Sequence, residues 1–283
     1  MNRRSFLKKF IGSTITLFGL TGGTYYYARN IEPGLLTIQS ESIVSTKIPA
    51  SFDGFKIVQF SDTHIGFQYT LTQFHDLITK INALNPDIIV FTGDLVDEPN
   101  KYDWSPKLTQ LLHDLKAYYG KYWIYGNHDH GGYGTEIVRD VMEKANFNLL
   151  QNSHQVIEKD VDRIILAGID DVILGSPNLP EALQHTNPEL FTILLSHEPD
   201  FADIAKKHPV DVQLSGHSHG GQVRLPLLGH LYTPIYAEKY VEGNYTFDSS
   251  DFKLFVSRGI GTTRLPYRFF CKPEITVFTL NKP

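Results

Sequence analysis

The stretch "YWIYGNHDH", residues 122–130, joins a short apolar run to a cluster of polar side chains that form turns and bind metals. A short, continuous apolar run is typical of a strand buried on both faces. The same order recurs at residues 55–64 and 87–94, where apolar runs end in "SDTH" and "TGD". This repetition predicts a layered α/β fold in which the chemistry lies at the strand ends.

Apolar runs and helical spacing predict the order of elements along the chain. Strands are expected over residues 55–60, 87–92, 122–125, 164–169, 191–195 and 210–214. Helices are expected between them over residues 71–84, 108–115 and 137–145. After about residue 221 the pattern changes to hairpin-like strands over 239–247, 252–257 and 274–280, which we expect to form a second mixed sheet packed on the first. The predicted fold is α/β, with two packed mixed β-sheets flanked by helices.

Composition indicates one large folded domain, residues 32–283, because 41% of the 283 residues are hydrophobic and 12% are aromatic. The net charge is −5, but residues 1–31 hold five basic residues and no acid, so the rest of the chain has 21 basic and 31 acidic residues. Such an acidic body disfavours bulk binding of nucleic acid. Cys271 is the only cysteine, so any metal must be held by nitrogen and oxygen ligands.

The first 31 residues are typical of a targeting segment. The basic stretch "MNRRSFLKKF" precedes an uncharged stretch over residues 11–28. Arg3 and Arg4, followed by "SFLK", resemble a twin-arginine export signal, which makes the twin-arginine export machinery an expected partner. We expect export to the cell envelope or secretion; cleavage of the segment and membrane attachment through residues 11–28 both remain open.

Replacing Arg3 and Arg4 by lysine should therefore keep the protein in the cytoplasm, because the export pathway recognises the arginine pair. Cell fractionation and immunoblotting of the two forms measure the effect. Unchanged export of the Lys-Lys form would contradict the twin-arginine interpretation.

Five of the predicted strands are followed by residue types that bind metals. The clusters are Asp62 and His64, Asp94 and Asp97, Asn127 to Asp129, His197, and His217 and His219. Each cluster alone is weak evidence, since Asp62 or Asp94 could cap a turn and Asn127 is an ordinary turn residue. Because ligands collect beyond the carboxyl ends of strands, we expect all five clusters to converge on a site for two metals. Gly126 is expected to permit the tight exit from its strand.

The ordered set DxH, GDxxD, GNHD, isolated His and GHxH resembles the calcineurin-like metallophosphoesterase superfamily over residues 55–220. The segments "GHSHGGQVRLP" (216–226), "SRGIGTT" (257–263) and "PEITVFTL" (273–280) further resemble bacterial exported YkuE-type phosphoesterases. The resemblance implies the α/β/β/α sandwich of that superfamily and two bound metal ions.

Carried over residue by residue, the resemblance implies a first metal held by Asp62, His64, Asp94 and His219, and a second held by Asp94, Asn127, His197 and His217. A carboxylate can share its two oxygens between cations and an imidazole cannot, which supports Asp94 as the bridge. A shared water or hydroxide would be the nucleophile. His128 would assist the leaving group, and Asp129 would orient its imidazole. Manganese, iron and zinc all suit these ligands.

Other polar residues keep two interpretations. Asp97 could support a ligand or cap a loop, and the spacing of His130 assigns it no role. Four arginines could bind phosphate oxygens or form salt bridges within an acidic protein: Arg224, Arg258, Arg264 and Arg268.

The leading hypothesis is an exported dinuclear-metal phosphoesterase that hydrolyses phosphate mono- or diesters, with a cell-envelope phosphodiester as the expected substrate. One alternative is a hydrolase of the pyrophosphate bond in nucleoside-diphosphate-linked acylated sugars, which are made in the cytoplasm. Another is a non-catalytic binding module on the same fold, although a scaffold has no need of seven ligands and His128. A protein phosphatase or nuclease has lower weight.

Overall fold

The computed structural model describes residues 3, 21–131, 135–248 and 250–283. Most of the expected targeting segment, including Arg4 and residues 11–20, lies outside the described residues. Within the described part of the chain, no helix combines the length and apolar character needed to cross a membrane.

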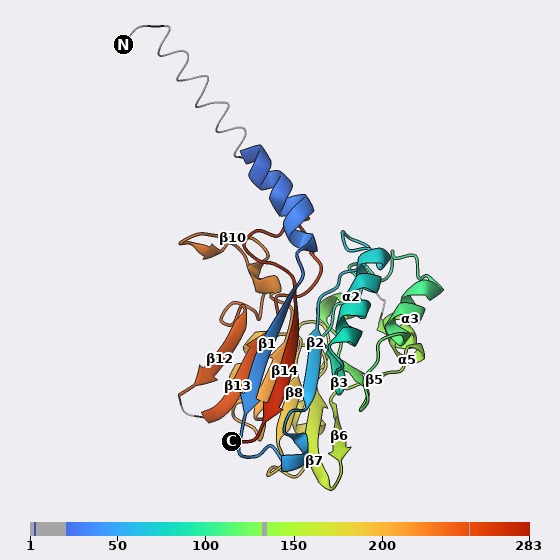
Figure 1. Ribbon diagram of the computed structural model, residues 1–283, viewed down its shortest axis with the longest axis vertical. Helices are drawn as coiled ribbons and strands as arrows, with labels where there is room; N and C mark the ends of the chain where they lie inside the picture. The colour runs from blue at the N-terminus through green and yellow to red at the C-terminus, as the bar shows by residue number, and fades with distance from the viewer. Residues whose placement is uncertain (1–2, 4–20, 132–134, 249) are drawn as a thin grey trace.

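The body contains two six-stranded mixed sheets (Figure 1). The first sheet has the strand order β1(Thr37–Val44), β14(Glu274–Asn281), β2(Lys56–Phe60), β3(Ile88–Phe91), β4(Lys121–Trp123), β5(Phe147–Leu149). The second has the order β12(Gly243–Phe247), β13(Ser250–Val256), β9(Val212–Ser215), β8(Thr192–Leu195), β7(Asp162–Gly168), β6(Ser153–Lys159). In each sheet the central strands are parallel and some pairs are antiparallel, β14 with β2 and β12 with β13 among them.

The assignment of strands to sheets differs from the sequence prediction. We expected the strands after residue 221 to build the second sheet, whereas four of its six strands come from the middle of the chain. The last strand, β14, instead lies between β1 and β2 in the first sheet. The reason is burial: Ile275 and Val277 pack toward the helices, and Phe278 and Leu280 pack between the sheets. A strand that buries both faces requires a central position.

Alternating side chains create the layers. In β3, Ile88 and Val90 join the cluster between the two sheets, and Ile89 and Phe91 join the cluster beneath the helices. The helices α2(Leu71–Ala83), α3(Pro106–His113) and α5(Thr135–Lys144) cover the first sheet on the right of Figure 1. The short helices α6(Leu179–Ala182) and α7(Ala202–Ala205) cover the outer face of the second. The α/β/β/α prediction is confirmed.

Helix α2 shows how local sequence sets these elements. The Thr70 hydroxyl caps the first turn by accepting a hydrogen bond from the backbone N–H of Gln73, and the side-chain oxygen of Gln73 accepts one from the backbone N–H of Thr70. Phe74, Leu77 and Ile81 are buried on one side of the helix. The capping box and the apolar stripe together fix where the helix begins and which face it buries.

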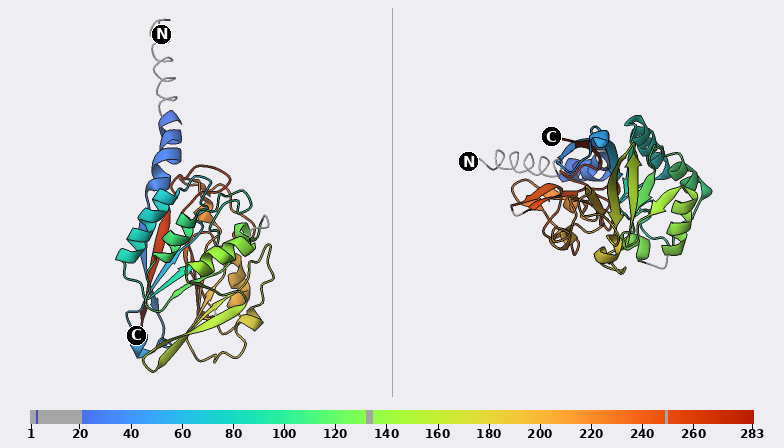
Figure 2. Two further views of the ribbon diagram at one scale, coloured as in Figure 1. Left: turned by 90° about the vertical axis from the view of Figure 1, so that its right-hand side faces the viewer. Right: turned by 90° about the horizontal axis from the view of Figure 1, so that it is seen from below.

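A helical segment, residues 21–31, projects from one end of the body (Figures 1 and 2). The carbonyl of Ala28 accepts a hydrogen bond from the backbone of Arg268 (2.9 Å). The rings of Tyr27 and Phe269 meet edge to face, with centroids 6.4 Å apart. The end of the expected targeting segment is thus packed on the C-terminal part of the chain.

Candidate metal centre

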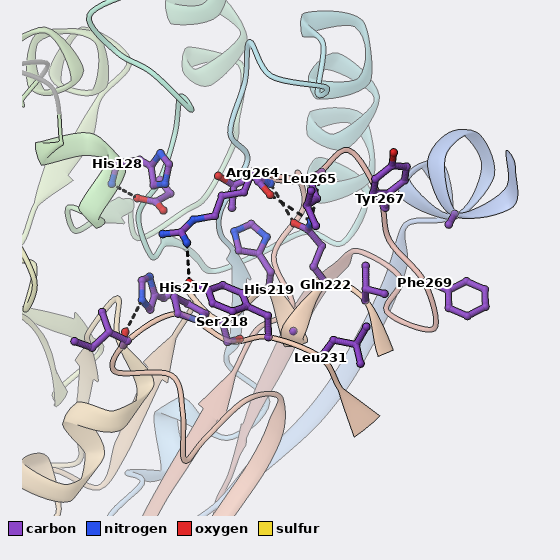
Figure 3. A pocket seen from close by; sticks show the side chains of 18 of the residues that line it. His128, His217, Ser218, His219, Gln222, Leu231, Arg264, Leu265, Tyr267 and Phe269 are labelled. Carbon is purple, nitrogen blue, oxygen red and sulfur yellow. Dashed lines mark hydrogen bonds between the residues drawn. The ribbon is translucent and has the colours of Figure 1, made fainter. Parts of the chain in front are cut away.

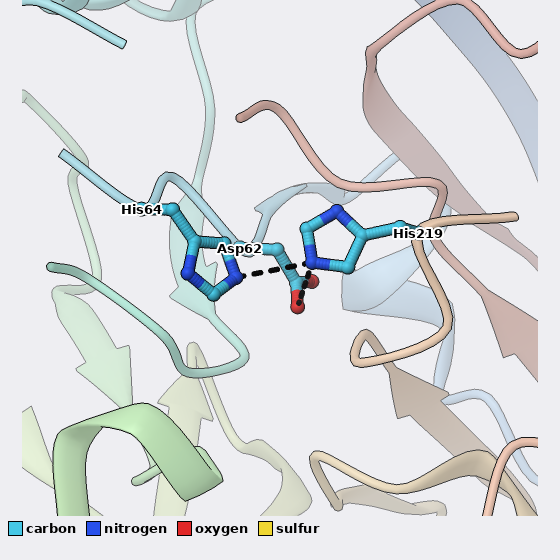
Figure 4. Close-up of side chains that lie close together, drawn as sticks. All are labelled: Asp62, His64 and His219. Carbon is cyan, nitrogen blue, oxygen red and sulfur yellow. Dashed lines mark hydrogen bonds and ion pairs between the residues drawn. The ribbon is translucent and has the colours of Figure 1, made fainter. Parts of the chain in front are cut away.

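The loops that follow β2, β3 and β4 in the first sheet meet those that follow β8 and β9 in the second. We expected the clusters to converge, and the structure brings them together between two sheets rather than along one. The described residues contain three compact groups of possible ligand atoms, each with its atoms within 4.8 Å of one another: Asp62, His64 and His219; Asp94, His197 and His217; and His64, Asp97 and His128. The first two groups contain residues that were predicted to hold the metals. Figure 4 shows the first group, in which the three side chains point toward one another.

In the first group, Nε2 of His64 lies 3.0 Å from Nε2 of His219, and the latter atom lies 3.5 Å from Oδ1 of Asp62. All three residues are buried. Two imidazole nitrogens and a carboxylate oxygen that converge without solvent are suited to a shared cation.

In the second group, Nδ1 of His197 contacts the carbonyl of Thr92 at 2.6 Å, and Nε2 of His217 contacts the carbonyl of Ile235 at 2.9 Å. A carbonyl only accepts, so each contacting nitrogen carries the proton and the other ring nitrogen has a free lone pair. Nε2 of His197 is buried without a hydrogen-bond partner, as is the side-chain oxygen of Asn127. Buried unpaired acceptors are costly, so these atoms fit metal ligation.

Asp94 joins the two groups. Its Oδ2 lies 3.4 Å from Nε2 of His64 and 3.3 Å from Nε2 of His197. Its Oδ1 accepts a hydrogen bond from the backbone N–H of His128 (2.8 Å). The structure therefore directs one oxygen toward both groups, whereas the sequence argument assigned one oxygen to each metal.

Burial controls the charge of this centre. It lowers the pKa of His217 to about 3 and holds that of His219 well below its ordinary value, so both rings are neutral and able to ligate. It also raises the pKa of Asp62. The other two rings differ: burial lowers their pKa, but the neighbouring carboxylates outweigh it, Asp97 and Asp94 raising the pKa of His64 and Asp94 holding that of His197 well above its ordinary value. Carboxylates enclosed in such a buried site carry a large desolvation penalty that cations would offset. The donors present therefore fit two metal ions.

The backbone at the centre is held in an unusual conformation. The left-handed region is adopted by Asp62 (φ 54°), His64 (42°), Asp94 (63°), His217 (66°) and His219 (51°). Each such residue costs about 1–3 kcal/mol, and such residues concentrate at functional sites. No simple sequence signal predicts this left-handed backbone conformation, because none of the five residues is glycine.

Gly126 has a different role from the one expected. Its φ of −108° and ψ of 175° are open to any residue. A Cβ at this position would overlap Oδ1 of Asp94 and lie 2.7 Å from Cε1 of His197. The glycine therefore provides space beside Asp94 and His197 rather than freedom to turn.

The role predicted for Asp129 is wrong. This fully buried carboxylate accepts hydrogen bonds from the backbone N–H groups of Asp94 (2.8 Å), Gly126 (2.9 Å) and Leu95 (3.0 Å), and no described contact joins it to the ring of His128. Burial, together with the charge of Asp94, raises its pKa to about 6. Asp129 ties the loop after β3 to the loop after β4.

His128 is oriented by Asp97 instead. Its Nδ1 contacts the backbone carbonyl of Asp97 at 2.7 Å, so this nitrogen donates and Nε2 is the atom left for substrate. Oδ1 of Asp97 lies 3.0 Å from Nδ1 of His64 and accepts a hydrogen bond from Thr263 (2.9 Å). Of the two interpretations of Asp97, the structure favours support of a ligand. The GDxxD spacing carried that signal, whereas the carbonyls of Thr92, Ile235 and Asp97 could not be found from sequence.

Three of the four candidate arginines are engaged in the body. Arg224 pairs with Glu242, and Arg258 with Glu274. Arg268 is fully buried, where it donates to backbone carbonyls such as that of Gly261. Arg264 instead lines the pocket that contains His128, His217 and His219 (Figure 3). His130, left without a role, contacts Oδ1 of Asp170 at 2.8 Å.

Comparisons with known proteins agree with this arrangement of residues. The family described as calcineurin-like phosphoesterase matches residues 55–221. The uncharacterized metallophosphoesterase YkuE of Bacillus subtilis is 46% identical over 99% of this chain and 98% of its own length. The phosphodiesterase YaeI of Escherichia coli is 28% identical over 96% and 98% of the two chains. The UDP-2,3-diacylglucosamine pyrophosphatase LpxG of Chlamydia muridarum is 29% identical over 95% and 97%.

The family match spans more than half of the chain, and the Bacillus relative matches almost all of it. The same residues build the buried donor groups described above. The chain therefore belongs to the calcineurin-like phosphoesterases of the YkuE type and is a metal-dependent hydrolase of phosphoric esters.

Proposed function

We propose that this hydrolase binds two metal ions and cleaves phosphate mono- or diesters. The observation that carries the proposal is the position of Asp94, whose Oδ2 lies within 3.4 Å of a histidine of each donor group. The first ion would be held by Asp62, His64, Asp94 and His219, and the second by Asp94, Asn127, His197 and His217. When bound, two such ions activate a water as nucleophile by lowering its pKa to about 7, and they neutralise the phosphate charge.

The chain's own residues would manage the leaving group. Nδ1 of His128 is held on the carbonyl of Asp97, which leaves Nε2 at the pocket. To donate from Nε2 the ring must carry a proton on both nitrogens, and the carboxylate of Asp97 lies 3.7 Å from Nδ1. Asp129 contributes indirectly, because it fixes the loop on which His128 lies.

Substrate and metal identity are further parts of the proposal. Nitrogen and oxygen donors suit manganese, iron or zinc. The phosphodiesterase named among the relatives favours a diester, and the pyrophosphatase keeps a pyrophosphate bond as the second candidate. The arginine pair and the uncharged residues 11–28 support export, for which a cell-envelope phosphodiester is the fitting substrate.

The test is turnover by the mature protein after its metals have been measured. With manganese added, we expect hydrolysis of bis(4-nitrophenyl) phosphate, loss of the activity after chelation, and its return on reloading. Parallel assays of 4-nitrophenyl phosphate and a nucleoside diphosphate sugar rank the three bond types. A sample that holds two ions per chain and hydrolyses none of these would instead support a binding module.

A further inference from the structure

A large cavity opens directly from the metal centre. Its volume is about 830 Å³, and Asp94, Asn127, His128, His217 and His219 form one end of it. A phosphate group fills roughly the space of a few waters, at about 30 Å³ each. Most of the cavity is therefore left for the part of the substrate that is not phosphate, and its walls indicate what that part is.

The walls are mainly apolar. Figure 3 shows His128 and His217 at one end and Tyr267 and Phe269 at the other. Between and around them lie the side chains of Val223, Leu225, Leu231, Ile235 and Leu265. The helical segment 21–31 completes the far wall with Thr24, Tyr25 and Ala28. A hydrocarbon chain would be desolvated on several sides here.

Several of the polar side chains in these walls already have partners within the protein. The amide of Gln222 bonds the carbonyl of Leu265 (2.8 Å) and the N–H of Thr263 (3.1 Å). The Thr263 hydroxyl donates to Asp97, and the Tyr232 hydroxyl accepts from Arg264 (2.7 Å). A nucleoside or sugar in the cavity would therefore find fewer free hydrogen-bonding side chains than the number of polar groups in the lining suggests. An apolar chain needs no hydrogen-bonding side chains.

Arg264 supplies a cation close to the metal centre. Its Nη1 donates to the hydroxyl of Tyr232, and its guanidinium lies 5.4 Å from the centroid of that ring. Figure 3 shows the side chain reaching toward His128 and His217. A guanidinium in this position can bind a phosphate oxygen. The charge at one end and the apolar walls beyond it match the two halves of an amphiphile.

The two segments that contribute most of the apolar wall also carry exposed apolar side chains. Of the nineteen large hydrophobic side chains that are exposed in the described structure, eight fall within residues 227–236 and 265–270. They include Leu227, Leu228 and Phe270, which are 107%, 75% and 62% exposed. Such a concentration marks an interaction site rather than an ordinary surface.

We propose that the substrate is an amphiphilic phosphate ester, whose phosphate binds at the metal centre beside Arg264 and whose hydrocarbon chain occupies this cavity. The inference rests on the proposed phosphoesterase function and adds the class of group attached to the phosphate. Dissolved alkyl phosphates and membrane lipids share this chemistry.

The test uses the full chain loaded with manganese and three diesters with the same leaving group: ethyl, butyl and octyl 4-nitrophenyl phosphate, below their micelle concentrations. We expect kcat/KM to rise about tenfold or more from ethyl to octyl, because added methylenes leave water. A binding readout accompanies it: calorimetry with ethyl- and octylphosphonate, for which the longer chain should bind more tightly with a more negative heat capacity change.

Leu231→Asp places a charge at the cavity mouth and should lower the octyl-to-ethyl ratio several-fold, for kcat/KM and for phosphonate affinity. The octyl-to-ethyl ratio does not depend on how much of the sample is correctly folded, so partial misfolding of the variant cannot change it. Val161→Asp is the matched control: Val161 is 94% exposed in the β6–β7 turn, at the opposite end of the molecule in Figure 1, and the ratio should stay unchanged.

Equal kcat/KM for all three diesters, or a ratio unaffected by Leu231→Asp, would overturn the inference while leaving the phosphoesterase proposal intact. Failure to hydrolyse any of the three diesters and 4-nitrophenyl phosphate as well would instead contradict the proposed function. The octyl diester in neutral phosphatidylcholine vesicles then separates the two sources: an undiminished rate indicates a membrane lipid and a lower rate a dissolved amphiphile, and either result retains the apolar chain as the group recognised.

Discussion

Asp94→Asn should remove metal from both donor groups and lower kcat/KM on the order of 10³-fold or more. The amide has the shape of the carboxylate and can still accept the hydrogen bond from His128, so the variant tests charge rather than packing. Oδ2 of Asp94 is the atom near both His64 and His197, and each metal would lose a charged ligand at once. Several kcal/mol of transition-state stabilisation depend on the ions, at about 1.4 kcal/mol per tenfold change in rate.

Metal content by mass spectrometry, beside turnover of an aryl phosphodiester, measures the effect. Asp97→Asn is the graded control, because Asp97 contacts His64 but is not a proposed ligand. Loss of such a supporting group typically costs about 10- to 100-fold in affinity or activity, so this variant should lose less than Asp94→Asn. Two ions retained by Asp94→Asn would show that Asp94 does not bridge them.

The sequence predicted the parts of this centre that depend on local order. Apolar runs located β2, β3 and β4, and the polar residues directly after them lie together in the structure. This success has a physical basis, because parallel strands end at the same edge of a sheet. It extends to β8 and β9 in the second sheet, since the carboxyl ends of both sheets meet at the centre.

Features that depend on long-range packing could not be predicted. β1 was not expected, because only Ile43 is fully buried among its mostly exposed residues, and its alternation is weak. Residues 21–31 were assigned to a targeting segment from composition alone, but Tyr27 and Ala28 pack against residues that lie some 240 positions later. The composition of a segment indicates which functions it suits, but not which surface of the protein it packs against.

Asp129 shows the same limit at the scale of one motif. Adjacent to His128 in sequence, it was expected to orient that ring, yet its carboxylate turns inward to three backbone N–H groups. The ring contacts Asp97, thirty-one positions earlier. Side-chain direction within a tight turn follows from backbone dihedrals, which neighbouring residue types do not specify.

His128→Ala should keep both metal ions and lose activity in a way that depends on the leaving group. The residue contributes only its backbone N–H to Asp94, and alanine retains that group. Its ring belongs to neither of the two proposed metal groups, although it forms a third cluster of possible ligands with His64 and Asp97 and lies edge to face on His64, with centroids 4.6 Å apart. We therefore expect metal content close to that of the unaltered protein.

An alkoxide leaving group needs a proton as the bond to phosphorus breaks, whereas 4-nitrophenolate is stable without one. General acid catalysis contributes about 10²- to 10⁴-fold, so His128→Ala should lose an effect of that size with an alkyl ester and much less with the nitrophenyl ester. His130→Ala is the matched control, since this neighbouring imidazole contacts Asp170 and should leave the ratio of the two rates unchanged. Equal losses with both esters would mean that His128 acts by positioning phosphate. Loss of metal would instead place His128 among the metal ligands, through the Nε2 that its hydrogen bond to the carbonyl of Asp97 leaves free.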